Sequence, residues 1–267
     1  MPHPPAGRRG PGARALLASA LSVTALLATA ACSVQGEPRP RWFSASPTVT
    51  GASPVGERPA SSGAGLTEAQ AQAALITDAD LGEPWGPTRG ARTWRDGLLK
   101  ATTKDRDCQR LLDALYTEEL FGTPAGPRAT AAFDDADTSA QLRYQVTAHP
   151  PADVDRTLAW LKSLPGKCGE FTAATTRGRV QTVQVSGMPL PRVGDARQAL
   201  RVTLTGETEK GELTYLTMDL AAVRVGEEAI TLTHAGLDEV HEEVTQQTAQ
   251  LGAQRLTEIT KQGRARI

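Results

Sequence analysis

Hydrophobic and polar residues alternate with a period of two in six segments between residues 129 and 234. Alternation of this kind predicts β-strands that turn one face toward a core and the other toward solvent. In Gln141–Ala148, for example, leucine, tyrosine, valine and alanine side chains fall on one face. The other five predicted strands are Ala129–Asp134, Val180–Gly187, Gln198–Thr205, Tyr215–Val225 and Ala229–His234. One apolar and one polar face are typical of an antiparallel sheet covered on one side.

Four further segments repeat apolar residues every three or four positions, which is the spacing of amphipathic helices. They are residues 67–76, Asp105–Leu120, Asp153–Leu164 and Asp238–Ile259. Thr67 and Gln70 fit a capping box at the start of the first helix, and Pro165-Gly166 is expected to end the third. We therefore predict one α+β domain over residues 66–267, with an antiparallel sheet of five to six strands and helices packed on one face.

The first 31 residues have the composition of a secretory signal peptide. Three arginines, Arg8, Arg9 and Arg14, precede the uncharged run Ala15–Ala31. That run is at the short limit for a membrane-spanning helix, and no positive residue follows it closely enough to stop transfer. Arg8-Arg9 is followed by Gly10-Pro11 where a twin-arginine signal needs an apolar residue, so the general secretory route is favoured.

Cys32 follows small residues at the expected cleavage point. The segment Leu26–Cys32 resembles a bacterial lipobox, with Thr29 at a position where leucine is usual. The resemblance implies that a diacylglyceryl group is attached to the Cys32 thiol, that cleavage occurs before it, and that the new amine is acylated. Two or three acyl chains would anchor the protein stably, because one chain binds a membrane only marginally. Ordinary cleavage nearby is the alternative.

Residues 32–65 are rich in proline, serine, threonine, glycine and alanine. Such a segment buries too little apolar surface to offset the entropy lost on ordering. We expect a disordered tether that holds the domain away from the lipid headgroups.

Charge and composition narrow the classes of partner. The chain has 267 residues, a formal net charge of −1 and 4% aromatic residues. Removing residues 1–31 takes away three arginines and changes this charge to −4. A nucleic-acid partner is therefore not expected, because such binding needs a clustered basic excess. The predicted location is the outer face of the cytoplasmic membrane, held there by acyl chains.

Cys108 and Cys168 are the only cysteines besides Cys32. An exported chain meets oxidising conditions, so we predict a disulfide between them. A reactive thiol is the alternative, and neither cysteine has a histidine partner close in the sequence.

Polar residues of the predicted strands form the candidate binding surface. If the strands align, arginines from two of them lie near tyrosine, threonine and aspartate side chains from a third. Arginines there would give charge-assisted hydrogen bonds to a polar or anionic ligand, and a solvated sheet face is the alternative. The candidate ligand-binding residues are Arg143, Arg201, Tyr215 and Asp219, accompanied by Gln145, Thr203 and Thr217.

Signals for metal binding or catalysis are weak. Asp238, His241, Glu242 and Glu243 fall near one helical face, and a solvated acidic helix explains them better than a metal site. The run Asp134–Asp137 lacks the spacing and the glycine of a calcium loop and predicts a turn. Nucleophile-elbow, P-loop and zincin motifs do not occur in the sequence, so we expect no catalytic residue, metal or cofactor.

Three short segments resemble recurrent landmarks of actinobacterial exported lipoproteins. They are Leu75–Gly82, Pro189–Ala196 and Val223–Gly226. Such proteins are similar to the extracellular sensor domain of mycobacterial PknH-type serine/threonine kinases, and the resemblance covers most of residues 66–260. It implies an α+β domain with a cleft that binds a ligand or partner. It also implies two disulfides, whereas this domain can form one.

The sequence thus favours a lipid-anchored, non-catalytic binding or sensor-like protein whose ligand is a small molecule, a lipid or another protein. A lipid or glycolipid carrier is the runner-up and would need an apolar cavity. A cell-envelope hydrolase is the third possibility and would need polar groups that converge in a pocket.

Overall fold

The computed structural model describes residues 65–90, 94–208, 210–237 and 240–264. The predicted signal peptide, Cys32 and residues 32–64 of the predicted tether lie outside this part of the chain, as do Asp238 and Glu239. Among the described residues, no helix combines the length and the apolar character needed to cross a bilayer.

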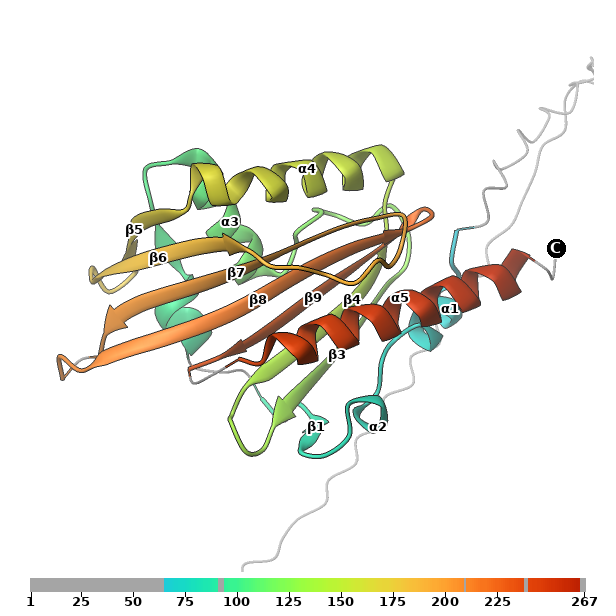
Figure 1. Ribbon diagram of the computed structural model, residues 1–267, viewed down its shortest axis with the longest axis horizontal. Helices are drawn as coiled ribbons and strands as arrows, with labels where there is room; N and C mark the ends of the chain where they lie inside the picture. Colours follow the sequence, from blue (N-terminus) through green and yellow to red (C-terminus); the bar gives the residue numbers. More distant parts are fainter. Residues whose placement is uncertain (1–64, 91–93, 209, 238–239, 265–267) are drawn as a thin grey trace, which may run out of the picture. The chain divides into compact units, whose positions relative to one another are not determined.

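A sheet of nine antiparallel strands forms the centre of the described domain (Figure 1). Its spatial order is β1-β3-β4-β9-β8-β7-β6-β5-β2. The strands are β1 (Trp85–Pro87), β2 (Ala101–Thr102), β3 (Arg128–Asp135), β4 (Gln141–Ala148), β5 (Glu170–Thr175), β6 (Val180–Gly187), β7 (Ala196–Glu207), β8 (Leu213–Val225) and β9 (Glu228–Gly236). The predicted antiparallel α+β architecture is confirmed.

All six predicted strands are present, and the sheet is larger than predicted because β1, β2 and β5 extend it at its two edges. The two outermost strands have three and two residues, too few for a period to be recognised in the sequence. The predicted tight turn at Gly226-Glu227 joins β8 to β9, and Gly226 has a φ of 65°.

The helices are α1 (Glu68–Ala73), α2 (Asp78–Leu81), α3 (Arg106–Thr117), α4 (Pro151–Lys167) and α5 (Glu242–Arg264), with a π-helical turn at Arg95–Leu99. Helix α1 begins with the predicted capping box of Thr67 and Gln70. Helix α4 does not end at Pro165 as predicted. It continues to Lys167, where the Cys168 N–H donates to the Leu164 carbonyl.

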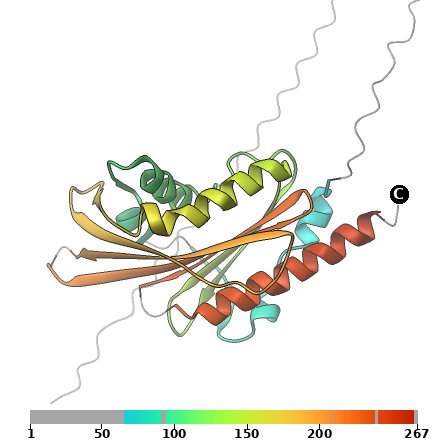
Figure 2. The same cartoon turned by 45° about the horizontal axis from the view of Figure 1, so that its top comes forward.

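Helices cover both faces of the sheet, whereas the sequence predicted one (Figure 2). Helices α3 and α4 lie on one face, with α4 over β6, β7 and β8. Helices α1 and α5 lie on the other, with α5 over β8 and β9. We call these the α4 face and the α5 face. Successive residues of β8 therefore enter two separate cores: Leu220 packs on the α4 face and Ala221 on the α5 face.

Residues 118–127, which we call the α3–β3 loop, complete the cover of the α4 face. Leu120 in this loop belongs to the same core as α4, and the Ala125 N–H donates to the Ala148 carbonyl at the end of β4. The polar positions of β4 and β9 thus lie beneath protein and are buried except for Arg143, which is half-buried, although their alternation predicted a solvated surface.

Candidate functional site

The four predicted ligand-binding residues do not form one surface. Arg201 of β7 and Asp219 of β8 are directly opposite each other on the α5 face. Tyr215 lies four residues before Asp219 on the same strand face and is 49% exposed. Arg143 of β4 belongs to the α4 face, because its neighbours Leu142 and Tyr144 pack in the core beneath α5. The candidate surface therefore separates into two polar clusters.

The first cluster centres on the carboxylate of Asp219, which is fully buried. Arg201 Nε donates to Oδ1 at 2.7 Å, and Arg201 Nη2 donates to Oδ2 at 2.9 Å. The same Nη2 donates to the Val240 carbonyl at 3.0 Å. The hydrogen bonds with Asp219 raise the pKa of Arg201. This bidentate pair is satisfied within the protein and holds the segment before α5 against the sheet.

Thr245 of α5 and His234 of β9 extend this cluster into the core. The Thr245 hydroxyl donates to Asp219 Oδ2 at 3.1 Å and lies 3.2 Å from His234 Nδ1. Since that hydroxyl gives its proton to Asp219, it must accept a hydrogen bond from His234 Nδ1. This assigns to the neutral ring the tautomer that carries its proton on Nδ1. Trp85 packs edge-on against His234, with 5.4 Å between ring centroids. Burial lowers the pKa of His234 to about 4.

The depressed pKa of His234 predicts an acid-sensitive fold. The unfolded chain binds a proton at His234 below pH 6.5, whereas the folded chain does so only near pH 4, so stability falls as the pH decreases through this window. The expected loss between pH 7 and pH 4 is about 3 kcal/mol. Urea unfolding at several pH values measures it. His234→Gln is expected to remove most of the pH dependence of stability. His241→Gln, at an exposed position, is the control and should retain it. If the stability of the two variants changes equally with pH, the acid sensitivity does not arise from His234.

The second cluster surrounds Glu118, the residue that follows α3. Its Oε1 lies 2.7 Å from Arg95 Nη1 and 2.6 Å from Arg143 Nε. Neither contact has hydrogen-bond geometry at Oε1, so one carboxylate oxygen interacts with two guanidinium groups by charge alone. The side chains of Arg95 and Glu118 are only 14% and 12% exposed. The low local dielectric strengthens these charge interactions relative to those at an open surface.

Neutral polar side chains adjoin this ion cluster on the α4 face. Gln145 is buried, and in the amide orientation that satisfies its neighbours it donates to the Glu118 carbonyl and accepts from Arg128 Nη2. Thr231 and Thr233 of β9 are also buried. These residues and Arg143 line a cavity of about 10 Å³ beside Glu118. A second cavity of the same size lies beneath the α3–β3 loop. Each has room for about one water molecule.

Two larger surface pockets lie away from these clusters. One, of about 390 Å³, is lined largely by proline, alanine and glycine at the start of α4, and His149 forms part of its wall. Burial lowers the pKa of His149, and its ring packs against Phe121. The other, of about 500 Å³, is a groove between α5 and residues 191–194.

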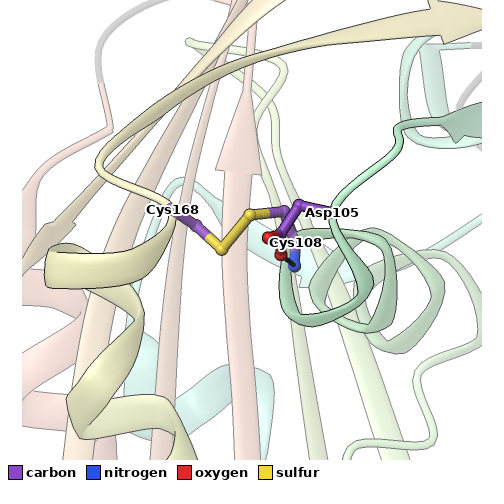
Figure 3. Close-up of side chains that lie close together, drawn as sticks. All are labelled: Asp105, Cys108 and Cys168. Atoms are coloured by element: carbon purple, nitrogen blue, oxygen red, sulfur yellow. Dashed lines mark hydrogen bonds between the residues drawn. A yellow bond between two sulfur atoms is a disulfide. The ribbon is translucent and has the colours of Figure 1, made fainter.

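Cys108 and Cys168 form the predicted disulfide, which joins α3 to the end of α4 (Figure 3). Asp105 lies beside the two sulfur atoms, and in the part of the chain that the structure describes these three residues are the only set with metal-like spacing. Their geometry has another explanation: the Asp105 carboxylate accepts from the Asp107 and Cys108 N–H groups and caps α3. The disulfide also consumes the thiolates that a metal ion needs.

The other acidic candidates have structural partners. Asp135 Oδ1 accepts from the N–H groups of Asp137 and Thr138, which confirms the turn predicted between two strands. Glu242 Oε1 contacts Gln246 one helical turn later, as expected for an exposed helix face. Asp238 lies outside the described residues.

The segment Leu75–Gly82 holds α5 in place. Asp80 Oδ1 and Oδ2 accept from Arg255 Nη2 and Nη1 at 2.7 and 2.8 Å. The hydrogen bonds from Arg255 lower the pKa of Asp80. Arg255 also donates to the Leu75 carbonyl.

The segments Pro189–Ala196 and Val223–Gly226 contact each other. Asp195 Oδ2 accepts from the Gly226 N–H at 2.7 Å and from Arg224 Nη1 at 3.3 Å. Gly194 has a φ of 62°, and a Cβ there would lie 2.5 Å from the Arg224 carbonyl oxygen. All three landmark segments therefore fix the fold at positions away from Arg95, Arg143 and Glu118.

No family model matches the sequence, and no curated protein matches it. Among solved structures, the extracellular domain of PknH from Mycobacterium tuberculosis is similar to this chain, with a TM-score of 0.45 and 14% sequence identity. The match covers 73% of this chain and 97% of that one. The lipoprotein and actinobacterial parts of the predicted resemblance stay predictions.

Proposed function

We propose that this protein is a lipid-anchored, extracytoplasmic binding or sensor-like lipoprotein without catalytic activity. The observation that carries the binding role is the polar cluster on the α4 face. Arg95, Arg143, Glu118 and Gln145 are placed where an apolar core would be more favourable, since charged groups are costly to bury. Charged groups kept largely out of solvent beside small cavities support a recognition role for this cluster.

Two of the three histidines in the described residues, His149 and His234, support binding rather than catalysis. His234 is enclosed by Thr245 and Trp85, and its depressed pKa keeps the ring neutral. His149 packs against Phe121, and burial favours its neutral form as well. Both rings have structural neighbours that account for their positions.

The two arginines predicted to bind ligand are expected to behave differently. Arg201 is fully engaged by Asp219, whereas Arg143 contacts a carboxylate without hydrogen-bond geometry. Arg143→Gln should therefore lower the binding of an acidic ligand, and Arg201→Gln should chiefly lower stability.

Anchoring is tested at Cys32. The full chain, expressed in a bacterium that acylates lipoproteins, is expected to incorporate labelled palmitate and to fractionate with membranes. Cys32→Ala should lose the label, because the lipobox places the acylated thiol at this position. Ser33→Ala is the matched control and should retain it. Equal labelling of the two variants, or no label in the unaltered chain, would show that this protein is not a lipoprotein.

The alternative function is that of a lipid or glycolipid carrier. The pocket of about 390 Å³ beside His149 supports it, since its walls are largely apolar. Mass spectrometry of organic extracts from the purified full chain separates the two functions. Stoichiometric lipid would favour the carrier, and its absence would favour the binding module.

A further inference from the structure

We propose that Arg95 and Arg143 form a binding site for the carboxylate of an acidic ligand, and that Glu118 occupies this site as an internal substitute. A ligand that carries a carboxylate on a short unbranched arm would bind by displacing Glu118. The proposal rests on the binding role proposed above and specifies its ligand class and its control.

The charges around Glu118 leave room for one further anion. Arg95 and Arg143 contact Glu118, and Arg128 lies 3.8 Å from Glu119. Among these five residues three arginines face two glutamates, so one positive charge is in excess within this set. Arg95 Nη2 also donates to the Tyr116 carbonyl at 2.8 Å, which fixes the orientation of its guanidinium group. Guanidinium groups prefer two parallel hydrogen bonds to a carboxylate, and the single oxygen shared by Arg95 and Arg143 provides none. A ligand carboxylate that enters from another direction can therefore bind them with better geometry.

The backbone conformation at Glu118 does not favour a glutamate. We therefore infer that the glutamate is present because of what its side chain contacts. Glu118 is the C-cap of α3 and has φ 61° and ψ 25°. This left-handed conformation is the usual place for glycine, because a Cβ is unfavourable there. A glutamate in this conformation is strained, and local strain of this kind is concentrated at ligand sites and switch regions.

The space around Glu118 fits the exchange. The two cavities of about 10 Å³ share Glu118, Gln145 and Thr231 as lining residues. Leu120 also lines both cavities. Withdrawal of the Glu118 side chain would vacate, beside them, the space of a carboxylate on two methylene groups. The Thr231 hydroxyl and the Gln145 amide can then donate to the carboxylate beside the two arginines. Because Glu118 begins the α3–β3 loop, its displacement also loosens the cover of the α4 face.

The test uses propionate, which reproduces the glutamate side chain, in isothermal titration of the full chain in detergent. Glu118→Gly removes the competing carboxylate and relieves the left-handed backbone. We expect millimolar binding to the unaltered chain and at least about tenfold tighter binding to Glu118→Gly. Propionamide, the neutral isostere, should not bind. Glu212→Gly, at an exposed position of the loop between β7 and β8, is the matched control, because Glu212 takes no part in this cluster, and it should bind like the unaltered chain.

Three results would overturn the proposal. The first is equal affinity of Glu118→Gly and Glu212→Gly for propionate at constant ionic strength. The second is an unchanged affinity when Arg143→Gln is added to Glu118→Gly. The third is binding to Glu118→Gly with none to the unaltered chain at 100-fold higher propionate, which would make the cluster a structural ion pair only. Glu118→Gln keeps the side-chain volume and serves if the glycine variant does not fold. The palmitate labelling is independent of these outcomes, so a failure of anchoring is recognised separately.

Discussion

Replacing Cys108 and Cys168 together with alanine is expected to lower the free energy of unfolding by about 4 kcal/mol, because the disulfide closes a loop of 60 residues in the unfolded chain. Both cysteines are buried between α3, α4 and the sheet, so alanine is preferred to serine, whose hydroxyl would lack a partner. Urea unfolding followed by circular dichroism measures the change. The same loss is expected when the unaltered protein is unfolded in the presence of a thiol reductant.

Other contacts between α3 and α4 remain when the disulfide is removed, and one of them provides a control variant for this experiment. Asp107 accepts from Trp160 Nε1 at 3.0 Å and from Lys167 Nζ at 2.7 Å, and the Arg110 guanidinium lies 3.9 Å from the Trp160 ring centroid. These contacts keep the two helices together after the disulfide is removed, so a native-like fold is expected. Lys167→Ala removes an exposed ion pair and should cost less than about 1 kcal/mol. A loss below that value for the double cysteine variant would contradict the loop-closure account.

Asp219→Ala is expected to cost about 3–5 kcal/mol, the range for removing one partner of a buried charge pair. Arg201 loses both hydrogen bonds from its guanidinium to a carboxylate, and the Thr245 hydroxyl loses its acceptor. Urea unfolding at pH 7 measures the difference.

A double variant separates the ion pair from packing. Arg201→Met combined with Asp219→Leu replaces both charges with apolar groups and should recover most of the loss. If the double variant is as unstable as Asp219→Ala, the cost arises from packing at Asp219 rather than from an unpaired arginine. Arg143→Met with Glu118→Leu is the corresponding change on the α4 face, and it is not expected to alter the Asp219 cluster, because the sheet lies between them.

The long strands were predictable because their alternation is continuous over six or more residues, as in Gln141–Ala148, which β4 reproduces with the same bounds. β1 and β2 were missed because two or three residues carry no period. Pro165 was predicted to end α4, but the helix continues to Lys167. Proline lacks a backbone N–H, and this loss is tolerated in the last turn because later residues still find acceptors. The Cys168 N–H, for example, donates to the Leu164 carbonyl. The disulfide was predictable because the sequence predicts export to oxidising conditions and because Cys108 and Cys168 are the only cysteines besides Cys32.

The candidate site was predictable only in part. Arg143 and Arg201 were both recognised as polar positions of strands, but placing them on one surface required a register that the sequence does not contain. A shift of one residue in the pairing of two strands moves a side chain to the other face of the sheet. The pairing is set by the neighbouring strand rather than by the strand's own residues alone. Glu118 was missed because it follows a helix in a conformation typical of glycine, and no local pattern marks such a residue. Its contacts with Arg95 and Arg143 come from segments 23 to 25 residues away in the chain.

The two edge strands limit how this domain behaves at high local concentration. β1 and β2 offer three and two residues for pairing with another chain, and β1 ends at Pro87, which lacks an N–H. β1 pairs with residues 133–135 of the longer strand β3, and β2 pairs with residues 174–175 of β5. Edges of this kind give an incoming strand too few hydrogen bonds to hold it, so crowded copies resist growth into a continuous sheet. Resistance to such growth thus depends on two short edge strands, of which Trp85 and Ala101 also pack against the cores of the two faces.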